Sequence, residues 1–408
     1  MSCRHCGYPL EHIFLDLGFA PPSNAYLTDA DLQLPESQFP LKLFVCDKCW
    51  LVQTEDFARP TELFGSDYAY FSSISKSWLE HASRYVEQMC KRFNLDPKSY
   101  VIEIASNDGY LLKNFIASRI PCLGIEPSSN TADAAEALGI KVLREFFCSD
   151  LGDRLSNENK SADLVLGNNI FAHVPDINDF TMGLKKVLKP DGVVTLEFPH
   201  LLRLLEGNQF DTIYHEHFSY LSLHTASRIF KQAGLIVWDV ETLPTHGGSL
   251  RVYGCNTENS RKISTSVKEV FTEEQSSGLN QLSTYLGFQE RVDRIKMELL
   301  SYLNEQKRMG KIVAAYGAAA KGNTLLNYAG VTSDLISFVC DAAPSKQGKY
   351  MPGSHIPIFP PYMLREKKPD SIMILPWNLT EEVISQNSYV REWGGKFVTA
   401  IPQIRIVN

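Results

Sequence analysis

The residues best suited to proton transfer gather in one short run, residues 211–220. It reads Asp-Thr-Ile-Tyr-His-Glu-His-Phe-Ser-Tyr, with imidazoles at His215 and His217, a carboxylate at Glu216 and a phenol at Tyr214. These groups make general acid–base chemistry easy to assemble. The His-x-His spacing would also suit a metal on a strand, and a solvated polar loop is the plain alternative. The aromatic residues in the run favour a segment that packs inward, and therefore a functional one.

A second polar segment, residues 167–176, follows a predicted strand at residues 162–166. It contains Asn168, Asn169 and His173. Polar groups at the carboxyl end of a parallel strand face the ligand cleft of an open α/β sheet. His173 alone would equally well cap the next helix, so the case for a functional role of His173 depends on the residues around it.

The pattern at residues 101–110 predicts a cofactor loop. An apolar strand, Val101–Ile104, is followed by a tight turn that contains Gly109 and then by an amphipathic helix from about Tyr110. Such a turn directs backbone N–H groups toward a ligand, and Glu126, at the tip of the next predicted strand, is placed to accept both hydroxyls of a ribose. Domains that bind NAD and domains that bind S-adenosylmethionine share this geometry.

Two features favour S-adenosylmethionine. Glu103 lies inside the first strand, where methyltransferases that use this cofactor usually carry an acid. Ala105 and Asn107 stand where a dinucleotide-binding fold has its first two glycines, and only a pyrophosphate needs that close approach to the backbone. The expected cofactor-binding residues are Glu103, Ala105, Asn107, Gly109, Glu126, Asn168 and Asn169.

The density of acid–base groups favours methyl transfer to carbon. Carbon becomes a nucleophile only after it loses a proton, and a neighbouring ketone makes that loss possible by taking the charge on oxygen. The enzyme then needs a base near the C–H bond and donors near the developing oxyanion. An imidazole is a suitable base because it is mostly neutral at pH 7.

Two C-x-x-C pairs near the N-terminus, Cys3 with Cys6 and Cys46 with Cys49, predict a structural zinc site. Four thiolates complete the tetrahedral set that zinc prefers and leave no position for water or substrate. A redox C-x-x-C is the alternative, but redox motifs occur once, in a βαβ unit. The other cysteines lack ligand spacing and are expected to be buried thiols.

Strands alternate with helices through most of the chain, which predicts an α/β fold with a parallel, doubly wound sheet. Further strands are expected at residues 122–125, 192–197, 338–341 and 372–375. A second strand-turn-helix at residues 311–324 resembles a P-loop, but Asn323 stands where the phosphate-binding lysine is required. We expect a Rossmann-like domain without its own cofactor, in which Lys321 and Lys346 contact phosphate. A dehydrogenase domain is the rival interpretation.

The segment His246-Gly-Gly-Ser-Leu-Arg251 reads as a glycine-rich turn that feeds a strand. Arg251 is placed either to meet a phosphate or to form an internal salt bridge. Helical segments are expected over roughly residues 267–308, with a break near Gly278.

Composition narrows the classes of function. The chain has 408 residues and a formal net charge of −7, so it has no broad basic face for nucleic acid. No apolar run approaches the roughly 18 residues of a membrane span. The N-terminus lacks the charged and apolar regions of a secretory signal, so we expect a cytoplasmic protein with neither a nucleic-acid nor a membrane partner.

In order along essentially the whole chain, the motifs resemble those of the sugar C-methyltransferase family, which acts on nucleotide-linked 4-keto-deoxysugars. The most specific pieces are Tyr-His-Glu-His at 214–217 and His-Gly-Gly-Ser-Leu-Arg at 246–251. The others are the cysteine pairs, Asp-Tyr-Ala-Tyr-Phe-Ser-Ser-Ile-Ser at 67–75, Glu-Ile-Ala-Ser-Asn-Asp-Gly at 103–109, His-Val-Pro-Asp at 173–176 and Ala-Tyr-Gly-Ala-Ala-Ala-Lys-Gly at 315–322.

The resemblance implies a fold and a set of roles. We expect a zinc-binding domain at 1–74, a class I methyltransferase domain that binds S-adenosylmethionine at 75–258, and a Rossmann-like domain at 259–408. His217 would be the general base for the carbon next to the ketone, C3 or C5, with C3 favoured. The implied partner groups are Tyr214, Glu216, His173 and Tyr68, and the candidate substrate contacts are Tyr70, His215, His246, Arg251 and Lys321.

The substrate would then be a dTDP- or GDP-linked sugar, and the oligomeric state stays open. An O- or N-methyltransferase of a nucleotide sugar or small metabolite is the runner-up. A zinc-ribbon scaffold without catalytic activity is the alternative from another class.

Overall fold

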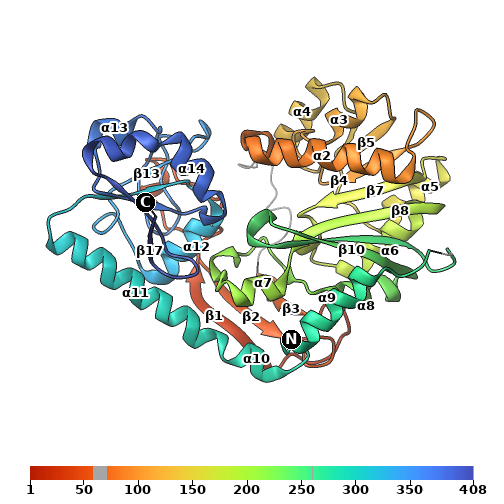
Figure 1. The fold of residues 1–408 in the computed structure, drawn as a ribbon, viewed down its shortest axis with the longest axis horizontal. Helices are drawn as coiled ribbons and strands as arrows, with labels where there is room; N and C mark the ends of the chain where they lie inside the picture. The colour runs from red at the N-terminus through yellow and green to blue at the C-terminus, as the bar shows by residue number, and fades with distance from the viewer. Residues whose placement is uncertain (58–70, 260, 408) are drawn as a thin grey trace.

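The computed structural model describes residues 1–57, 71–259 and 261–407, which form three β-sheets. Figure 1 shows the C-terminal unit on one side, the central unit on the other, and the N-terminal strands below and between them. Among the described residues, none of the helices is long and apolar enough to cross a membrane.

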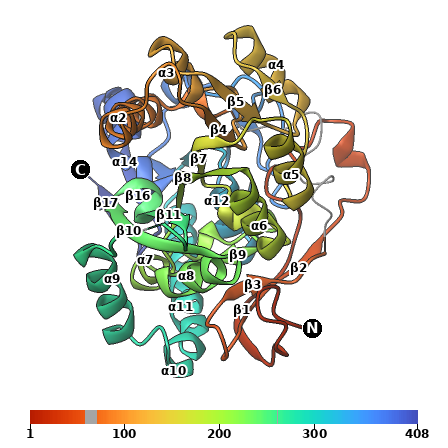
Figure 2. The ribbon, with the colours of Figure 1, turned by 90° about the vertical axis from the view of Figure 1, so that its right-hand side faces the viewer.

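The N-terminal sheet has the strand order β1-β2-β3-β9 and is antiparallel throughout. Its last strand comes from far along the chain: β9 begins two residues after His217 and pairs with β3. The N-terminal sheet therefore fixes one end of the His-Glu-His run (Figure 2). The strands are β1 (His12–Ala20), β2 (Phe39–Val45), β3 (Val52–Thr54) and β9 (Ser219–Tyr220).

The central sheet has the order β10-β11-β8-β7-β4-β5-β6. The strands from β6 to β8 are parallel, as expected, but β11 runs antiparallel to both β8 and β10. The turn at residues 244–248 is too short for a parallel crossover, so β10 and β11 form a hairpin at the edge of the sheet. The strands are β4 (Val101–Ile104), β5 (Cys122–Ile125), β6 (Val142–Leu143), β7 (Ala162–Asn168), β8 (Leu188–Pro199), β10 (Leu235–Leu243) and β11 (Ser249–Asn256).

Helices cover both faces of this sheet, as the doubly wound pattern requires (Figures 1 and 2). Ser75 caps the longest of them, α2, by accepting a hydrogen bond from the backbone of Trp78. The helices are α2 (Lys76–Phe93), α3 (Leu112–Ala117), α4 (Ser129–Ala137), α5 (Ser149–Asn157), α6 (Ile177–Val187), α7 (Leu201–Glu206) and α8 (Leu223–Gln232).

The C-terminal unit begins with α9 (Thr265–Ser276), α10 (Leu282–Leu286) and α11 (Phe288–Arg308), so the expected helical stretch breaks between residues 277 and 281. Its sheet, of order β14-β13-β12-β15-β16-β17, is parallel except for β17. The remaining elements are β12 (Val313–Tyr316), α12 (Ala320–Ala329), β13 (Val339–Cys340), β14 (Ile358–Phe359), α13 (Met363–Lys367), β15 (Ser371–Ile374), α14 (Thr380–Gln386), β16 (Lys396–Thr399) and β17 (Arg405–Val407).

A single apolar core joins the N-terminal sheet to the C-terminal unit. Phe14 of β1 stacks on Phe288 of α11 at a ring-centroid distance of 5.1 Å. Phe210, just before the His-Glu-His run, belongs to the same core. Protein interiors pack densely, so a residue in this core has a fixed position. Phe210 therefore anchors the His-Glu-His run to the core shared by the N-terminal sheet and the C-terminal unit. The expected domain limits at 74 and 258 stay a prediction.

Candidate active site

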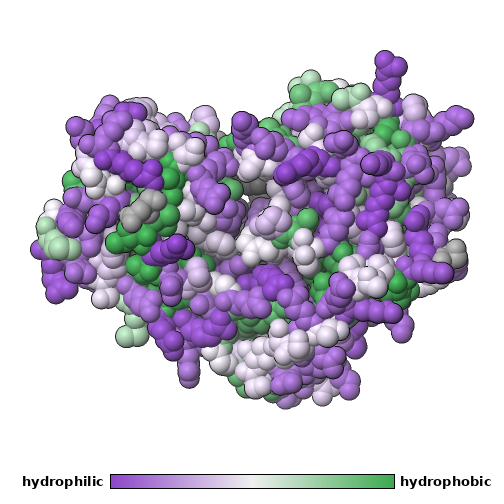
Figure 3. Space-filling view, viewed as in Figure 1, coloured by the Kyte–Doolittle hydropathy of each residue, from purple (hydrophilic) through white to green (hydrophobic). Residues whose placement is uncertain are grey.

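One large cavity of about 630 Å³ lies where the three units meet. The surface is hollowed between the C-terminal and central units, as Figure 3 shows. The volume lies within the usual range for ligand pockets. Asn24 of the N-terminal unit, Glu126 of the central unit and Lys321 of the C-terminal unit all line this one cavity. The structure thus brings together residues separated by almost 300 positions in sequence.

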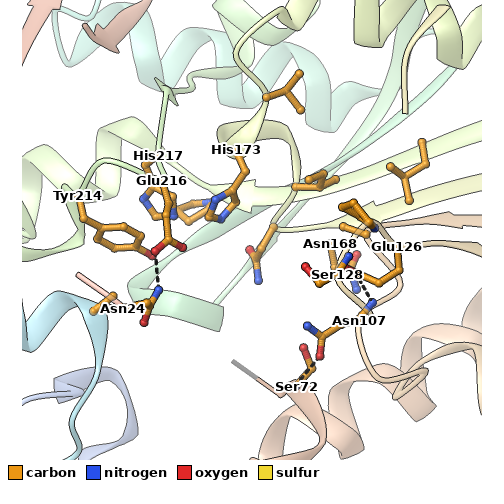
Figure 4. A pocket seen from close by; sticks show the side chains of 18 of the residues that line it. Asn24, Ser72, Asn107, Glu126, Ser128, Asn168, His173, Tyr214, Glu216 and His217 are labelled. Carbon is orange, nitrogen blue, oxygen red and sulfur yellow. Dashed lines mark hydrogen bonds between the residues drawn. The ribbon is translucent and has the colours of Figure 1, made fainter. Parts of the chain in front are cut away.

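His217 is nearly buried, and its ring is oriented by the backbone. The Nδ1 atom lies 2.8 Å from the carbonyl oxygen of Thr212. A carbonyl only accepts hydrogen bonds, so Nδ1 carries the proton and Nε2 has a free lone pair. The rings of His173 and Tyr214 lie 4.6 and 4.0 Å from the His217 ring, centroid to centroid, and all three residues line the cavity (Figure 4).

The surroundings keep both imidazoles neutral. Burial lowers the pKa of His217 well below its ordinary value, and the neighbouring His173 and Lys321 lower it further. Burial also lowers the pKa of His173 to about 4. A backbone hydrogen bond from Phe218 to the carbonyl of Ala172, 2.8 Å long, ties the two histidine-bearing segments together. The site therefore holds two neutral imidazoles at physiological pH.

Glu216 also lines the cavity and is 3% exposed. Its Oε1 atom accepts a hydrogen bond of 2.6 Å from the Nδ2 atom of Asn24 (Figure 4). The sequence did not single out Asn24, because a lone asparagine after Pro21 and Pro22 carries no signal beyond that of a turn.

His215 does not reach the cavity, although the sequence suggested a substrate contact. Its Nε2 atom lies 3.2 Å from the carbonyl oxygen of Pro40, and its ring meets the edge of Phe39 at 6.0 Å between centroids. His215 and His217 therefore bind different partners and do not form the alternative metal site. Their segment is a turn rather than a strand, so alternate residues do not share a face.

The cofactor loop has the strained backbone expected for close contact with a ligand. Ala105, Asn107 and Gly109 all have positive φ angles, of 57, 49 and 76°. A Cβ atom on Gly109 would lie 2.3 Å from Cδ1 of Ile140, so only glycine fits there.

The carboxylate of Glu126 accepts hydrogen bonds from the backbone N–H groups of Asn107, at 3.0 Å, and Ser128, at 2.9 Å. It lines the cavity together with Ala105, Asn107, Asn168 and Asn169. Within the described parts of the chain, the Nδ2 atom of Asn168 is buried without a hydrogen-bond partner. A buried donor without a partner lowers stability unless a ligand accepts its hydrogen bond. The Asn168 amide and the Glu126 carboxylate therefore fit the amino-acid and ribose groups of S-adenosylmethionine.

Glu103 lies beneath the loop and does not line the cavity, which corrects the expectation of a direct cofactor contact. It is 1% exposed, and in the described chain neither carboxylate oxygen has a hydrogen-bond partner. Burial and the nearby Asp108 and Glu126 raise its pKa well above the ordinary value. Its carboxyl group is therefore neutral, which is how a buried acid avoids the cost of an unpaired charge.

His246, a candidate substrate contact from the sequence, lines the cavity. Its Nε2 atom lies 2.9 Å from Nδ2 of Asn169, and both residues have left-handed backbones, with φ of 53 and 58°. The ring also meets Trp78 edge-on at 5.0 Å between centroids. Two strained residues in direct contact at a cavity wall are typical of a binding site.

Arg251 is internal, which corrects the suggested phosphate contact. It is 2% exposed, and its guanidinium donates to Glu197 at 2.8 Å and to Glu241 at 3.0 Å. It also lies 4.7 Å from the centroid of the Tyr85 ring. The guanidinium thus forms ion pairs with carboxylates of the adjacent strands β8 and β10.

Lys321, at the start of α12, reaches the cavity. Its Nζ atom donates to Oδ1 of Asn378 at 2.7 Å and lies 4.7 Å from the centroid of a Trp377 ring. The Trp377 indole in turn donates to the buried carboxylate of Asp211 at 2.7 Å. Burial lowers the pKa of Lys321, and the nearby Asp211 opposes that shift.

Tyr68 and Tyr70 lie outside the described residues. Several other cavity residues were not anticipated from the sequence, because their types are ordinary for a core or a loop: Ser72, Trp78, Tyr110, Phe146, Phe147, Cys148 and Asn378.

The four N-terminal cysteines converge on one point. The Sγ atoms of Cys3 and Cys49 lie 3.5 Å apart and those of Cys6 and Cys46 3.6 Å apart, and all four lie within 4.8 Å of one another. Tetrahedral zinc–thiolate bonds of about 2.3 Å require nearly this spacing. The Nε2 atom of Gln53 donates to Sγ of Cys3 at 3.2 Å, the kind of outer contact that orients a metal ligand.

Comparisons with known proteins cover the whole chain. Residues 3–64 match a family of domains described as zinc binding, residues 78–240 a methyltransferase domain, and residues 244–402 the C-methyltransferase C-terminal domain. The chain is 35% identical to the C-methyltransferase NovU of Streptomyces niveus over 407 residues, which is 100% of this chain and 97% of that protein.

More distant similarity covers less than half of the chain. The chain is 22% identical to a ubiquinone biosynthesis O-methyltransferase of Bartonella tribocorum over 151 residues, covering 32% of this chain and 61% of that protein. A solved S-adenosylmethionine-dependent methyltransferase from Clostridium acetobutylicum aligns with 44% of this chain and 92% of its own, at 12% identity and a TM-score of 0.36.

The motifs, the cavity and the full-length similarity agree with the resemblance seen in the sequence. The fold comprises a zinc-binding module, a class I methyltransferase unit and a second Rossmann-like unit, and the cofactors are S-adenosylmethionine and zinc. The chain belongs to the family of S-adenosylmethionine-dependent C-methyltransferases that carry an N-terminal zinc-binding domain and a dedicated C-terminal domain.

Proposed function

We propose that this enzyme methylates C3, next to the ketone of a nucleotide-linked 4-keto-deoxysugar, and that His217 removes the proton from that carbon. The observation that carries the proposal is the hydrogen bond from Nδ1 of His217 to the carbonyl of Thr212, which leaves Nε2 as a proton acceptor in the cavity wall. An O-methyltransferase needs a base but no donors for an enolate, whereas this wall also presents the phenol of Tyr214 and the neutral imidazole of His173.

In the proposed reaction the C3–H bond breaks, its proton moves to Nε2 of His217, and its electron pair spreads onto the ketone oxygen. When bound, S-adenosylmethionine would supply an electrophilic methyl group to this carbon, and the electrons of the broken S–CH₃ bond would stay on sulfur in the neutral thioether product. The rings of Tyr214 and His173, 4.0 and 4.6 Å from the His217 ring between centroids, are assigned to the oxyanion and to the orientation of the sugar. Tyr68 is proposed as a further active-site group and Tyr70 as a further substrate contact, on the resemblance of their sequence segment to the family motif.

A nucleotide-linked substrate is supported by a parallel between the two Rossmann-like units. In the central unit, Glu126 accepts hydrogen bonds from the loop N–H of Asn107 and from Ser128. In the C-terminal unit, Asp341 accepts from the loop N–H of Ala318, at 2.6 Å, and from Ala343, at 2.7 Å. Both loops therefore have the arrangement of a strand-turn-helix ligand site.

The loop of the C-terminal unit also brings cations to the cavity. Lys321 and Lys346 both line the cavity. The Nζ atom of Lys346 donates to the carbonyl of Ala318 in the loop at 2.7 Å. We propose that these two ammonium groups bind the diphosphate of a dTDP- or GDP-linked sugar, while His246 contacts the sugar. The proposed units are residues 1–74, 75–258 and 259–408.

The test is incubation with S-adenosylmethionine labelled in the methyl group and a panel of dTDP- and GDP-4-keto-6-deoxysugars. The expected product shows a new C–CH₃ signal by NMR and no O–CH₃ or N–CH₃ signal. A separate incubation in D₂O follows deuterium uptake at C3, which isolates the deprotonation. An O-methylated product, or consumption of NAD(P)H by the C-terminal unit, would overturn the proposal.

A further inference from the structure

The loop that follows β1, residues 21–27, extends from the N-terminal sheet into the active site. Its central residue, Asn24, lines the cavity and is the only residue before position 72 that does so among those described. The Nδ2 atom of Asn24 lies 2.6 Å from Oε1 of Glu216, and Figure 4 shows the two side chains facing each other. A carboxylate only accepts hydrogen bonds, so the amide nitrogen faces it.

The C-terminal unit holds this loop on both sides of Asn24. The carbonyl oxygen of Ser23 accepts a hydrogen bond of 2.7 Å from Nδ2 of Asn323 in α12. The phenol of Tyr26 donates to the carbonyl of Ala318 at 2.5 Å. The first contact involves the backbone of Ser23 and the second the side chain of Tyr26, and neither involves the Asn24 side chain. The loop therefore does not depend on the bond to Glu216 for its own position.

We infer that Asn24 is a positioning residue of the active site, whose carboxamide fixes the orientation of the Glu216 carboxylate at the cavity wall. The inference rests on the proposed role of Glu216 in orienting the substrate or supporting the enolate. A charge-assisted hydrogen bond of this length is roughly twice as strong as a neutral one. With Oε1 held by Asn24, the carboxylate plane cannot rotate freely between alternative partners.

The electrostatic setting of Glu216 makes this inference testable by pH. The titratable groups that share its surroundings are His173, Tyr214 and His217 from the central unit, Lys321 and Lys346 from the C-terminal unit, and Tyr26 from the loop itself. Asn24 is neutral at every pH. A carboxylate introduced at position 24 would face Glu216 directly, and two such groups at hydrogen-bond distance share a proton.

Three variants of the full-length enzyme separate positioning from folding. Asn24→Ala removes the hydrogen bond and is expected to lower kcat about 10- to 100-fold, with the KM for S-adenosylmethionine unchanged. Asn24→Asp is expected to add a loss of kcat/KM toward higher pH, where both carboxylates are charged and repel each other. Its activity relative to wild type should therefore rise as the pH falls, because a protonated Asp donates to Glu216 as the amide does.

Tyr26→Phe is the matched control, since it removes an anchor of the same loop and leaves the Asn24 amide in place. It should keep a kcat within about twofold of wild type, as for the loss of one of several loop contacts. Wild-type kcat in Asn24→Ala, or an unchanged kcat/KM profile in Asn24→Asp, overturns the inference.

A substrate-independent measurement keeps this result separate from the proposed function. NMR of protein labelled with ¹³C at the Glu side-chain carboxyl, assigned with Glu216→Gln, follows the titration of Glu216 directly. The Glu216 titration should move upward in Asn24→Asp relative to wild type. If the wild type does not methylate any keto-sugar, the proposed function fails; if the NMR titration is unchanged by Asn24→Asp, the positioning by Asn24 fails.

Discussion

The Nδ1 atom of His217 lies 2.8 Å from the carbonyl oxygen of Thr212, five residues earlier in the same loop. This hydrogen bond selects the tautomer in which Nε2 accepts a proton, and it uses only the backbone to do so. Ser219 and Tyr220, which follow His217, pair with β3 of the N-terminal sheet. The proposed base is thus fixed between a turn of the central unit and a strand of the N-terminal one.

Replacement of His217 by Ala or Asn should reduce methyl transfer by about 10² to 10⁴-fold, the usual contribution of a general base. Binding of S-adenosylmethionine, measured by calorimetry, should stay within a few fold of wild type, because the cofactor loop lies on other elements. Deuterium uptake at the substrate carbon should fall in parallel with turnover. His215→Asn is the matched control, since that imidazole faces Pro40 outside the cavity. Near-normal transfer by folded His217→Ala would exclude this residue as the base.

Stability should depend on pH through His173, whose folded-state pKa burial lowers to about 4. Between pH 6.5 and 4 the unfolded chain binds a proton at this position and the folded chain does not, so the free energy of unfolding decreases as the pH falls. Above pH 6.5 the residue is neutral in both states. The total effect is at most about 3 kcal/mol.

The measurement for His173 compares urea unfolding of the wild type and His173→Gln between pH 7.5 and 5. Asp211, whose pKa burial raises to about 6, titrates in the same window with the opposite sign. Because both proteins contain Asp211, its contribution cancels in the difference. The stability of the variant should fall less steeply toward acid pH. Parallel curves would show that His173 is not buried in the neutral form.

Zinc should be required for the N-terminal fold and, through β9, for activity. A purified preparation should contain about one zinc per chain by atomic emission, because four thiolates complete a structural site. Cys49→Ser should lose the metal, lower the thermal midpoint and reduce turnover, since the N-terminal sheet pairs with the strand after His217. Cys90→Ser should keep full zinc content. A metal-free protein with normal stability and turnover would contradict this role.

Replacement of Arg251 should destabilise the fold rather than weaken substrate binding. Arg251→Met leaves Glu197, which is 0% exposed, without its guanidinium partner. Removing one partner of a buried ion pair typically costs about 3–5 kcal/mol. The double variant Arg251→Met/Glu197→Gln should recover part of that loss in a denaturant titration. If Arg251→Met raises the substrate KM tenfold without a change in stability, the guanidinium contacts the substrate after all.

Gly109→Ala should weaken cofactor binding, because its Cβ would lie 2.3 Å from Ile140 at a φ of 76°. We expect at least a tenfold increase in the Kd for S-adenosylmethionine as the loop shifts. Gly139→Ala is a close control: its φ is 81°, but a Cβ there meets nothing within 4 Å. That variant should lose about 1 kcal/mol of stability from backbone strain alone and keep its affinity. Equal affinities in both variants would rule out a tight cofactor loop.

Patterns of local spacing predicted much of this protein. The strands at 101–104 and 122–125 are observed at the same limits, because apolar runs between turn residues specify buried parallel strands. The four cysteine ligands were also predicted from the sequence, because two C-x-x-C turns supply the four thiolates of a structural zinc site. The antiparallel β10–β11 hairpin was not, because periodicity reports exposure and says nothing about the direction in which a strand pairs.

The sequence did not show which individual polar residues face the cavity. His215 and His217 look equivalent in sequence, yet only one faces the cavity, because the direction of a side chain in a turn depends on backbone angles that no local pattern sets. The sequence suggested that Arg251 and Glu103 contact ligands. In the structure, Arg251 forms an ion pair with the buried Glu197, and the carboxyl group of Glu103 is itself buried.

The sequence by itself determined the chemistry available: thiolates for a metal, a glycine turn for a cofactor and a cluster of imidazoles for proton transfer. The tertiary structure alone decided which of these groups meet. Asn24 reaches Glu216 across 192 positions because the N-terminal loop is docked on α12, and that docking depends on long-range packing of separate apolar surfaces. Such contacts are set by the shape of the whole core, which is why no short stretch of sequence contains them.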